Sequence, residues 1–249
     1  MNLLLIAHIA APVLVLGILY LVIFGYRQYN LRKKSKTPFT ENALLRLPGH
    51  SLAQQIRDLD EKLTSYIFLL FLLSIIFTNT IIASSLVQKQ LTISSIFLFC
   101  FIGMLALLFF IFKIVKRLSQ REKLRLGYFG ELVTAEALSK LMPEGNYVFH
   151  DFPADNFNID HIVVGPAGVF AIETKARSKA VAGDNKQAAR ALYNGREIEF
   201  SNFKDTKFLE QAKRQAKWLS GWLKNSTGEF VKVFPVVCLP GFFVENKSA

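Results

Sequence analysis

Three long apolar runs occupy the first 115 residues, and a pattern of short apolar segments follows them. The runs cover about residues 3–24, 66–87 and 93–112. A helix needs about 20 predominantly apolar residues to cross a bilayer. The pattern therefore predicts three transmembrane helices, with residues 25–65 as the connection between the first and the second. A cleaved signal peptide is the alternative for the first run, but no Lys or Arg precedes it and its apolar part is too long.

Basic residues flank these runs asymmetrically. Five Lys and Arg lie between Arg27 and Lys36, six lie between Lys113 and Arg125, and the turn between the second and third runs has only Lys89. Positive flanks stay on the cytoplasmic side of a membrane. The N-terminus is therefore predicted outside, with residues 25–65 and 116–249 in the cytosol. Within the first of these segments, Ser51–Leu63 has the apolar spacing of an amphipathic helix with Ser51 as N-cap, lying on the membrane or against the soluble domain.

Residues 116–249 have the pattern of a soluble α/β domain. A helix is predicted to open at Gly127 and to end near Pro143, and a strand follows at Tyr147–Phe152. A hairpin, a helix at about Lys207–Lys224 and a strand at Val231–Leu239 complete the series. The net charge of +11 divides into +6 for residues 1–115 and +5 for the remainder. Membrane topology accounts for over half of this excess, so charge alone is weak evidence for nucleic acid.

The predicted hairpin contains the candidate functional residues. A Gly-Pro-Ala-Gly turn separates two β-branched runs, and a turn centred between Pro166 and Ala167 places Val164 opposite Val169. The same register places Asp160 opposite Glu173, with Lys175 on that face, because side chains alternate along a strand.

Two carboxylates so close on a largely apolar face repel each other and need compensation. Lys175 balances one of them. A divalent cation is the simplest further partner, because Mg²⁺ is held by one or two carboxylates, waters and substrate phosphate. A half-exposed strand with a routine Glu–Lys pair is the alternative reading.

At these residues the chain resembles the nuclease-related domain (NERD) family, which is similar to the PD-(D/E)xK nucleases. The resemblance covers about residues 125–245 and rests on Gly130-Glu131, Ile-Asp160-His-Ile-Val-Val, Gly-Pro-Ala-Gly-Val-Phe and Ile-Glu173-Thr-Lys175. It implies a restriction-endonuclease-like α/β domain with a mixed central sheet. Asp160 and Glu173 match the metal ligands of that superfamily, with Ile159 in place of the usual Pro. Lys175 matches its catalytic lysine and Glu131 the acidic residue of the first helix.

The same resemblance implies that glutamines of the downstream helix line the site, and Gln211 and Gln215 share one face of that helix. Two solvated glutamines are the alternative. The helix also carries Lys and Arg suited to phosphates, namely Lys207, Lys213, Arg214, Lys217 and Lys224. His161 points to the face opposite Asp160 and is expected to pack or to make a structural hydrogen bond.

These observations predict a multi-pass protein of a cell inner membrane whose partners are the lipid bilayer and nucleic acid, with DNA favoured by the resemblance. Its expected activity is phosphodiester hydrolysis with Mg²⁺ or Mn²⁺. The alternative is a catalytically inactive, membrane-tethered nucleic-acid-binding or scaffold module, because a fold does not fix a function. A transporter is disfavoured because the apolar runs contain no Asp, Glu, Lys or Arg.

Overall fold

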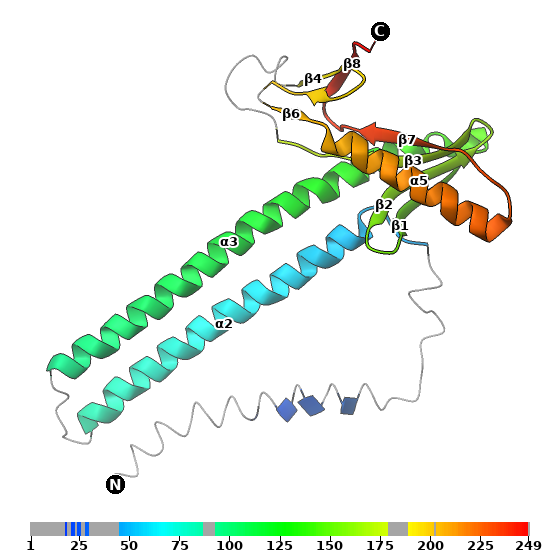
Figure 1. The fold of residues 1–249 in the computed structure, drawn as a ribbon. Helices are drawn as coiled ribbons and strands as arrows, with labels where there is room; N and C mark the ends of the chain where they lie inside the picture. Colours follow the sequence, from blue (N-terminus) through cyan, green and yellow to red (C-terminus); the bar gives the residue numbers. More distant parts are fainter. Residues whose placement is uncertain are drawn as a thin grey trace. The chain divides into compact units, whose positions relative to one another are not determined.

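The structure is a computed structural model that describes residues 45–86, 93–178, 189–201 and 203–248, with a few positions between 18 and 29. Figure 1 shows two long helices and a mixed α/β region. The chain divides into two compact units, one containing Asp60–Leu118 and the other combining Leu44–Leu59 with Ser119–Ala249. Each unit is described by itself. Most of the predicted helix at 3–24 lies outside the described residues.

Helix α2 spans His50–Leu86 without interruption. The separate helices predicted at 51–63 and 66–87 are therefore one helix. The residues that join them, Leu63 to Ser65, include neither Gly nor Pro, so nothing breaks the backbone hydrogen bonding there. The hydroxyls of Thr64 and Ser65 donate hydrogen bonds to backbone carbonyls one turn earlier, at 2.8 and 2.9 Å, which is compatible with a continuous helix.

Helix α3 spans Ile93–Ser139, so the prediction of a new helix opening at Gly127 is wrong. Gly127 and Gly130 lie inside this helix, where glycine costs about 1 kcal/mol relative to alanine. Their role is close packing. A Cβ on Gly130 would lie 2.6 Å from the Cβ of Ala176, and one on Gly127 would lie 3.2 Å from a Leu52 methyl. Glycine at these positions marks contact rather than a helix start.

Within the described residues, one helix is long and apolar enough to cross a membrane, at His50–Ile82. The predicted run 93–112 forms the first part of α3, and its apolar side chains include the exposed Phe97, Phe101 and Leu108. Rings of Tyr66 and Phe110 lie 6.0 Å apart between these two helical stretches. Three membrane spans therefore remain a prediction.

The α/β unit contains two four-stranded sheets. The first has the order β1-β2-β3-β7, formed by β1 (Tyr147–Pro153), β2 (Asn158–Gly165), β3 (Gly168–Thr174) and β7 (Val233–Cys238). Its β3–β7 pair is parallel and the others antiparallel, so the predicted mixed sheet is confirmed. The second has the order β6-β5-β4-β8, formed by β4 (Arg190–Tyr193), β5 (Ile198–Glu199), β6 (Lys204–Asp205) and β8 (Phe243–Asn246).

Helix α5, Lys207–Thr227, packs on the first sheet, and a short 3-10 turn, η2 (Met142–Glu144), follows α3. The core between α5 and the sheet includes Ile159, Ala171 and Leu219, each at most 2% exposed. Ala216 and Leu219 of α5 belong to this core, so their side of the helix faces the sheet. This packing fixes which side chains of α5 reach the carboxylates of β2 and β3.

Candidate metal centre

The β2–β3 register is the one that the sequence predicts. Val164 pairs with Val169, and the ladder continues to His161 opposite Ile172. One more step brings Asp160 level with Glu173, where Oδ2 of Asp160 accepts a hydrogen bond from the backbone N–H of Thr174 at 2.7 Å. The two carboxylates and Lys175 therefore lie on the sheet face that α5 covers.

Glu173 is the most enclosed member of the cluster, with 1% of its surface exposed. Its Oε1 forms an ion pair with Nζ of Lys175, and its Oε2 accepts a hydrogen bond from Nε2 of Gln215. Nε2 of Gln215 also lies 3.3 Å from the carbonyl of Asn158. Both carboxylate oxygens thus have partners, and an ion pair this enclosed depends on them, because burying a charge without partners is costly.

Asp160 carries the strongest electrostatic perturbation in the cluster. Burial raises its pKa to about 8, and the negative charges of Glu173 and Glu131 add to that rise. The Thr174 N–H and the charge of Lys175 act in the opposite direction without cancelling it. With no further positive charge, the Asp160 carboxyl keeps its proton at neutral pH.

Glu131 reaches the cluster from α3, at the point where Gly130 allows the helix to approach Ala176. It is 6% exposed, and its Oε2 has no hydrogen-bond partner among the residues that the structure describes. Burial raises the pKa of Glu131 to about 7, with further increases from Asp151 and Glu173, while a hydrogen bond from the backbone of Gly49 lowers it. A buried carboxyl oxygen without a partner is uncommon in a folded protein and requires an explanation.

The chemistry of these side chains fits a divalent cation. Besides Oε2 of Glu131, the buried Oε1 of Gln215 has no partner in the described part of the chain. Carboxylate and amide oxygens are the ligands that Mg²⁺ and Mn²⁺ accept. Among the described residues there is no group of three or more His, Cys, Asp or Glu placed to hold a metal together. The fit is therefore to a site with two carboxylate ligands that water or a phosphate oxygen completes.

The predicted glutamines behave differently. Gln215 is fully buried and contacts Glu173, whereas Gln211 is half-buried and makes no hydrogen bond within the described part of the chain. His161 lies on the other face, as predicted, with its Nδ1 2.9 Å from Nδ1 of His150. Burial, with a smaller effect of His150, lowers the pKa of His161 to about 3, which keeps the ring neutral. His161 is thus a structural residue.

Sequence reasoning missed Asp151. This residue is 1% exposed and adopts φ 47°, a conformation that non-glycine residues rarely adopt. Its carboxylate accepts hydrogen bonds from Ser51, Arg46 and Asn158 at 2.6 to 3.2 Å. Asp151 therefore connects the segment at the start of α2 to β2, and its charge contributes to the raised pKa of Glu131. An Asp inside the short strand pattern of β1 gives no signal of this role.

Fold and site together define an α/β domain with mixed sheets, which fits a nuclease-like architecture. Residues 126–240 match the family described as the nuclease-related domain (NERD), so this part of the chain is similar to that family. A stretch of 67 residues is 39% identical to an uncharacterised protein of Bacillus anthracis and covers 25% of this chain and 32% of that protein. The chain therefore matches about a third of that curated relative. No solved structure matches the chain.

Proposed function

We propose that the chain is a membrane-anchored, metal-dependent nuclease that hydrolyses phosphodiester bonds of nucleic acid, with DNA as the favoured substrate. One observation carries the proposal. Asp160 and Glu173 lie side by side on a covered face with Lys175 as their cation. Glu131 is near enough for its charge to raise the pKa of Asp160, and one of its carboxyl oxygens has no partner among the described residues. The match of residues 126–240 to the nuclease-related domain supports the same chemistry.

Asp160 and Glu173 would hold Mg²⁺ or Mn²⁺, with Gln215 fixing the orientation of Glu173. When bound, such an ion neutralises charge on the scissile phosphate and makes bound water more acidic. Lys175 would orient the attacking water or stabilise negative charge on phosphate oxygens, which fits its partly exposed position at the edge of the cluster. Glu131 would accept a hydrogen bond from a water in the site. The two oxygens of Glu173 have different partners, Lys175 and Gln215, and these contacts hold the carboxylate in one orientation.

Membrane anchoring is the second part of the proposal. The apolar stretch of His50–Ile82 has a mean hydropathy of 2.1 over its best window and none of that window is buried. Together with the predicted runs at 3–24 and 93–112, it supports a multi-pass protein of the inner membrane with the nuclease-related domain in the cytosol.

The deciding experiment uses the full chain in detergent. Supercoiled plasmid and labelled single- and double-stranded oligonucleotides are incubated with Mn²⁺, with Mg²⁺ or with EDTA, beside an Asp160→Asn variant prepared in the same way. Cleavage that requires the metal and disappears in the variant is expected. Equal cleavage by both proteins would indicate a contaminating nuclease and would remove the support for this function.

A specific observation favours one alternative, an inactive scaffold that retains the nuclease fold. Lys175 already pairs with Glu173, and the raised pKa values of Asp160 and Glu131 allow both of these carboxyls to be neutral near pH 7. The cluster is then electrically balanced without metal. Calorimetric titration with Mn²⁺ separates the two functions, because the scaffold requires no divalent ion and the nuclease does.

A further inference from the structure

A hollow with basic walls lies between α5 and the segment that enters β7. Its volume is about 490 Å³. Lys213, Lys217 and Lys224 line it from α5, and Lys232 lines it from the opposite wall. Spacings of four and seven residues place the three helical lysines on one face, about 6 and about 10 Å apart along the axis.

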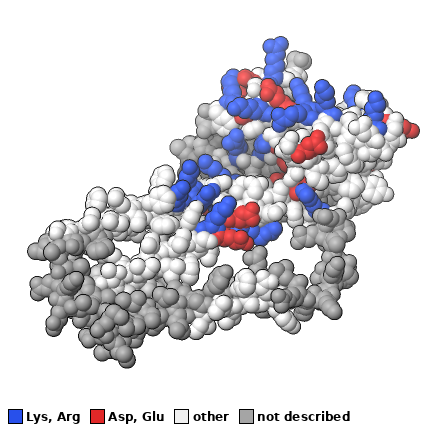
Figure 2. Space-filling view, turned by 60° about the horizontal axis from the view of Figure 1, so that its bottom comes forward, with Lys and Arg blue, Asp and Glu red and all other residues white. Residues whose placement is uncertain are grey.

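No acidic residue lines this hollow, and none of its four lysines forms an ion pair within the described residues. Two exposed cations elsewhere in the same unit do have acidic partners: Lys204 contacts Glu197 at 3.0 Å, and Arg190 contacts Glu245 at 3.0 Å. Lys and Arg also outnumber Asp and Glu on the face displayed in Figure 2. Four like charges around one hollow repel each other, so an anionic partner would stabilise them.

The floor and rim of the hollow suit a chain-like ligand. Small side chains form the floor, and a Cβ added to Gly221 would meet nothing within 4 Å. The ring of Phe230 lines the hollow with 76% of its surface exposed. An exposed ring beside a row of lysines is the arrangement by which proteins bind single-stranded nucleic acid, with cations on phosphates and aromatic rings stacked on bases.

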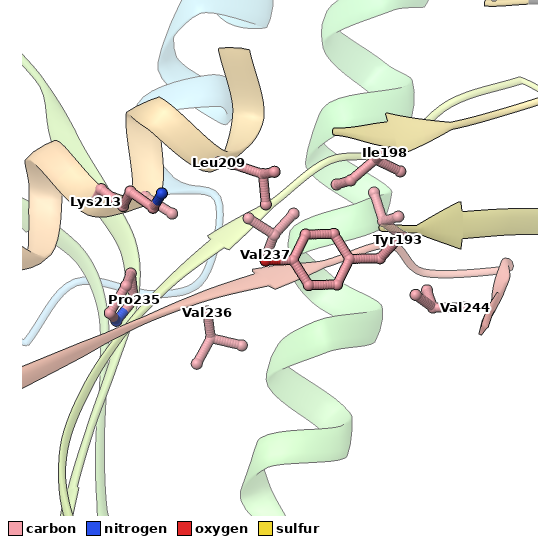
Figure 3. A pocket seen from close by; sticks show the side chains of 10 residues that line it. Tyr193, Ile198, Leu209, Lys213, Pro235, Val236, Val237 and Val244 are labelled. Carbon is pink, nitrogen blue, oxygen red and sulfur yellow. The ribbon is translucent and has the colours of Figure 1, made fainter. Parts of the chain in front are cut away.

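A second hollow continues the first along α5. It has a volume of about 310 Å³ and shares Lys213 and Pro235 with its neighbour. Figure 3 shows its mainly apolar lining, with Leu209 from α5 opposite Val237 from β7, and with the ring of Tyr193 beside them. Apolar walls and a tyrosine ring can accept the faces of unstacked bases. The two hollows together follow one side of α5.

We propose that these two hollows form one groove that binds single-stranded nucleic acid alongside α5. The inference rests on the proposed nuclease function and adds the form of the substrate. Bases in a duplex are already stacked on each other, so only an unpaired strand can offer them to Phe230 and Tyr193. An anionic bilayer surface lacks such bases, and a flat lipid surface does not fit a concave site with an aromatic rim.

Binding without cleavage tests the groove. The full chain in zwitterionic nanodiscs is titrated, in EDTA, against a fluorescein-labelled single-stranded oligonucleotide and against the matching duplex, with anisotropy as the readout. The groove variant is Lys213→Glu/Lys217→Glu/Lys224→Glu. The matched control, Lys140→Glu/Arg196→Glu/Lys247→Glu, changes the net charge equally at exposed residues that also form no ion pair.

We expect the groove variant to weaken single-strand binding at least tenfold and to lower the slope of log K against log salt by about three, whereas the control stays near wild type. Phe230→Ala should weaken binding about tenfold with little change of salt slope, because stacking is not ionic. Equal losses of single-strand affinity in the two triple variants would overturn the groove. Tighter binding of duplex than of single strand would overturn it too, and so would a groove variant that loses affinity only for anionic vesicles. If the wild type binds single strands in this way but cleaves nothing with Mn²⁺, the groove stands and the nuclease function fails.

Discussion

The hydroxyl of Ser51 donates a hydrogen bond to Oδ1 of Asp151 at 2.6 Å, across 100 residues of sequence. Because Ser51 lies in the first turn of α2, this contact makes residues 44–59 part of the α/β unit. The neighbouring Gly49 donates its backbone N–H to Glu131 and has its Cα against the ring of Tyr128. The described site thus depends on a segment that lies outside the matched family region.

Replacing Arg46 by Ala should destabilise the α/β unit by about 1–3 kcal/mol, because the nearly buried Asp151 carboxylate would lose a charged partner. Arg46 itself is partly exposed, so the loss should stay below that for a fully buried pair. Arg57→Ala is the control, since Arg57 is exposed on helix α2, which begins shortly after Arg46. Thermal unfolding of the full chain, followed by Trp fluorescence, measures the difference. Equal melting temperatures for the two variants would count against the role of Asp151.

Gly130→Ala should displace α3 from the end of β3, because the new methyl would lie 2.6 Å from the Cβ of Ala176. Glu131 would move with the helix, so we expect lower stability, by about 1–3 kcal/mol, together with weaker metal binding. Gly221→Ala is a matched substitution in α5, where a Cβ meets open space, and it should stabilise the helix by up to about 1 kcal/mol. Differential scanning fluorimetry on both variants shows whether each substitution lowers or raises the melting temperature.

Asp160→Asn and Glu173→Gln should each abolish Mn²⁺ binding, or weaken it at least tenfold, and should abolish cleavage. Asp160→Asn should not lower stability, because burial and the charges of Glu173 and Glu131 already favour an uncharged side chain at this position. Lys175→Ala should retain measurable metal binding but lose turnover. Asp155→Asn is the control, since that carboxylate lies on the surface and accepts a hydrogen bond from Trp218 at 3.0 Å. Unchanged calorimetric titrations in Asp160→Asn would remove Asp160 from the site.

The basic clusters beside the apolar runs predict a cytosolic NERD domain. A reporter active only in the cytosol, fused after residue 249, should give signal, and a periplasmic reporter at the same position should give none. Fusions after Lys89 should show the opposite result, which makes the two positions internal controls for each other. Cytosolic signal at both positions would contradict the predicted hairpin of 66–87 and 93–112.

Local pattern was enough to predict the hairpin of the candidate site, but not the elements around it. Alternation of apolar residues around the turn at Pro166 fixes the β2–β3 register, because a shift of one residue would expose Ile162 and Ala171. The continuity of α2 and α3 was not predictable in this way. A glycine such as Gly130 signals a helix start in sequence, yet it serves here a contact with Ala176 that only the tertiary structure creates. The role of Asp151 likewise depends on partners about 100 residues away.

The affinity for Mn²⁺ should rise with pH up to about pH 8. Burial and neighbouring negative charges raise the pKa of Asp160 to about 8 and that of Glu131 to about 7. Below these values both carboxyls hold protons, which a metal ion must displace. Between pH 6 and 7 we expect about a tenfold gain per pH unit for each proton released, and a plateau above pH 8.

The same raised pKa values determine how the stability of the metal-free protein changes with pH. A carboxyl whose pKa is higher in the folded state than in the unfolded state favours folding when it is protonated. Its contribution to stability is therefore complete below about pH 4, the usual pKa of a carboxyl in the unfolded chain. The contribution is lost as the pH rises toward the folded-state pKa values of about 7 for Glu131 and about 8 for Asp160. Mn²⁺ should therefore stabilise the protein more at pH 8 than at pH 6, and Asp160→Asn should remove much of that difference. Calorimetry in two buffers with different ionisation enthalpies counts the protons released. A metal affinity that does not change between pH 6 and 8 would show that neither carboxyl takes part in binding.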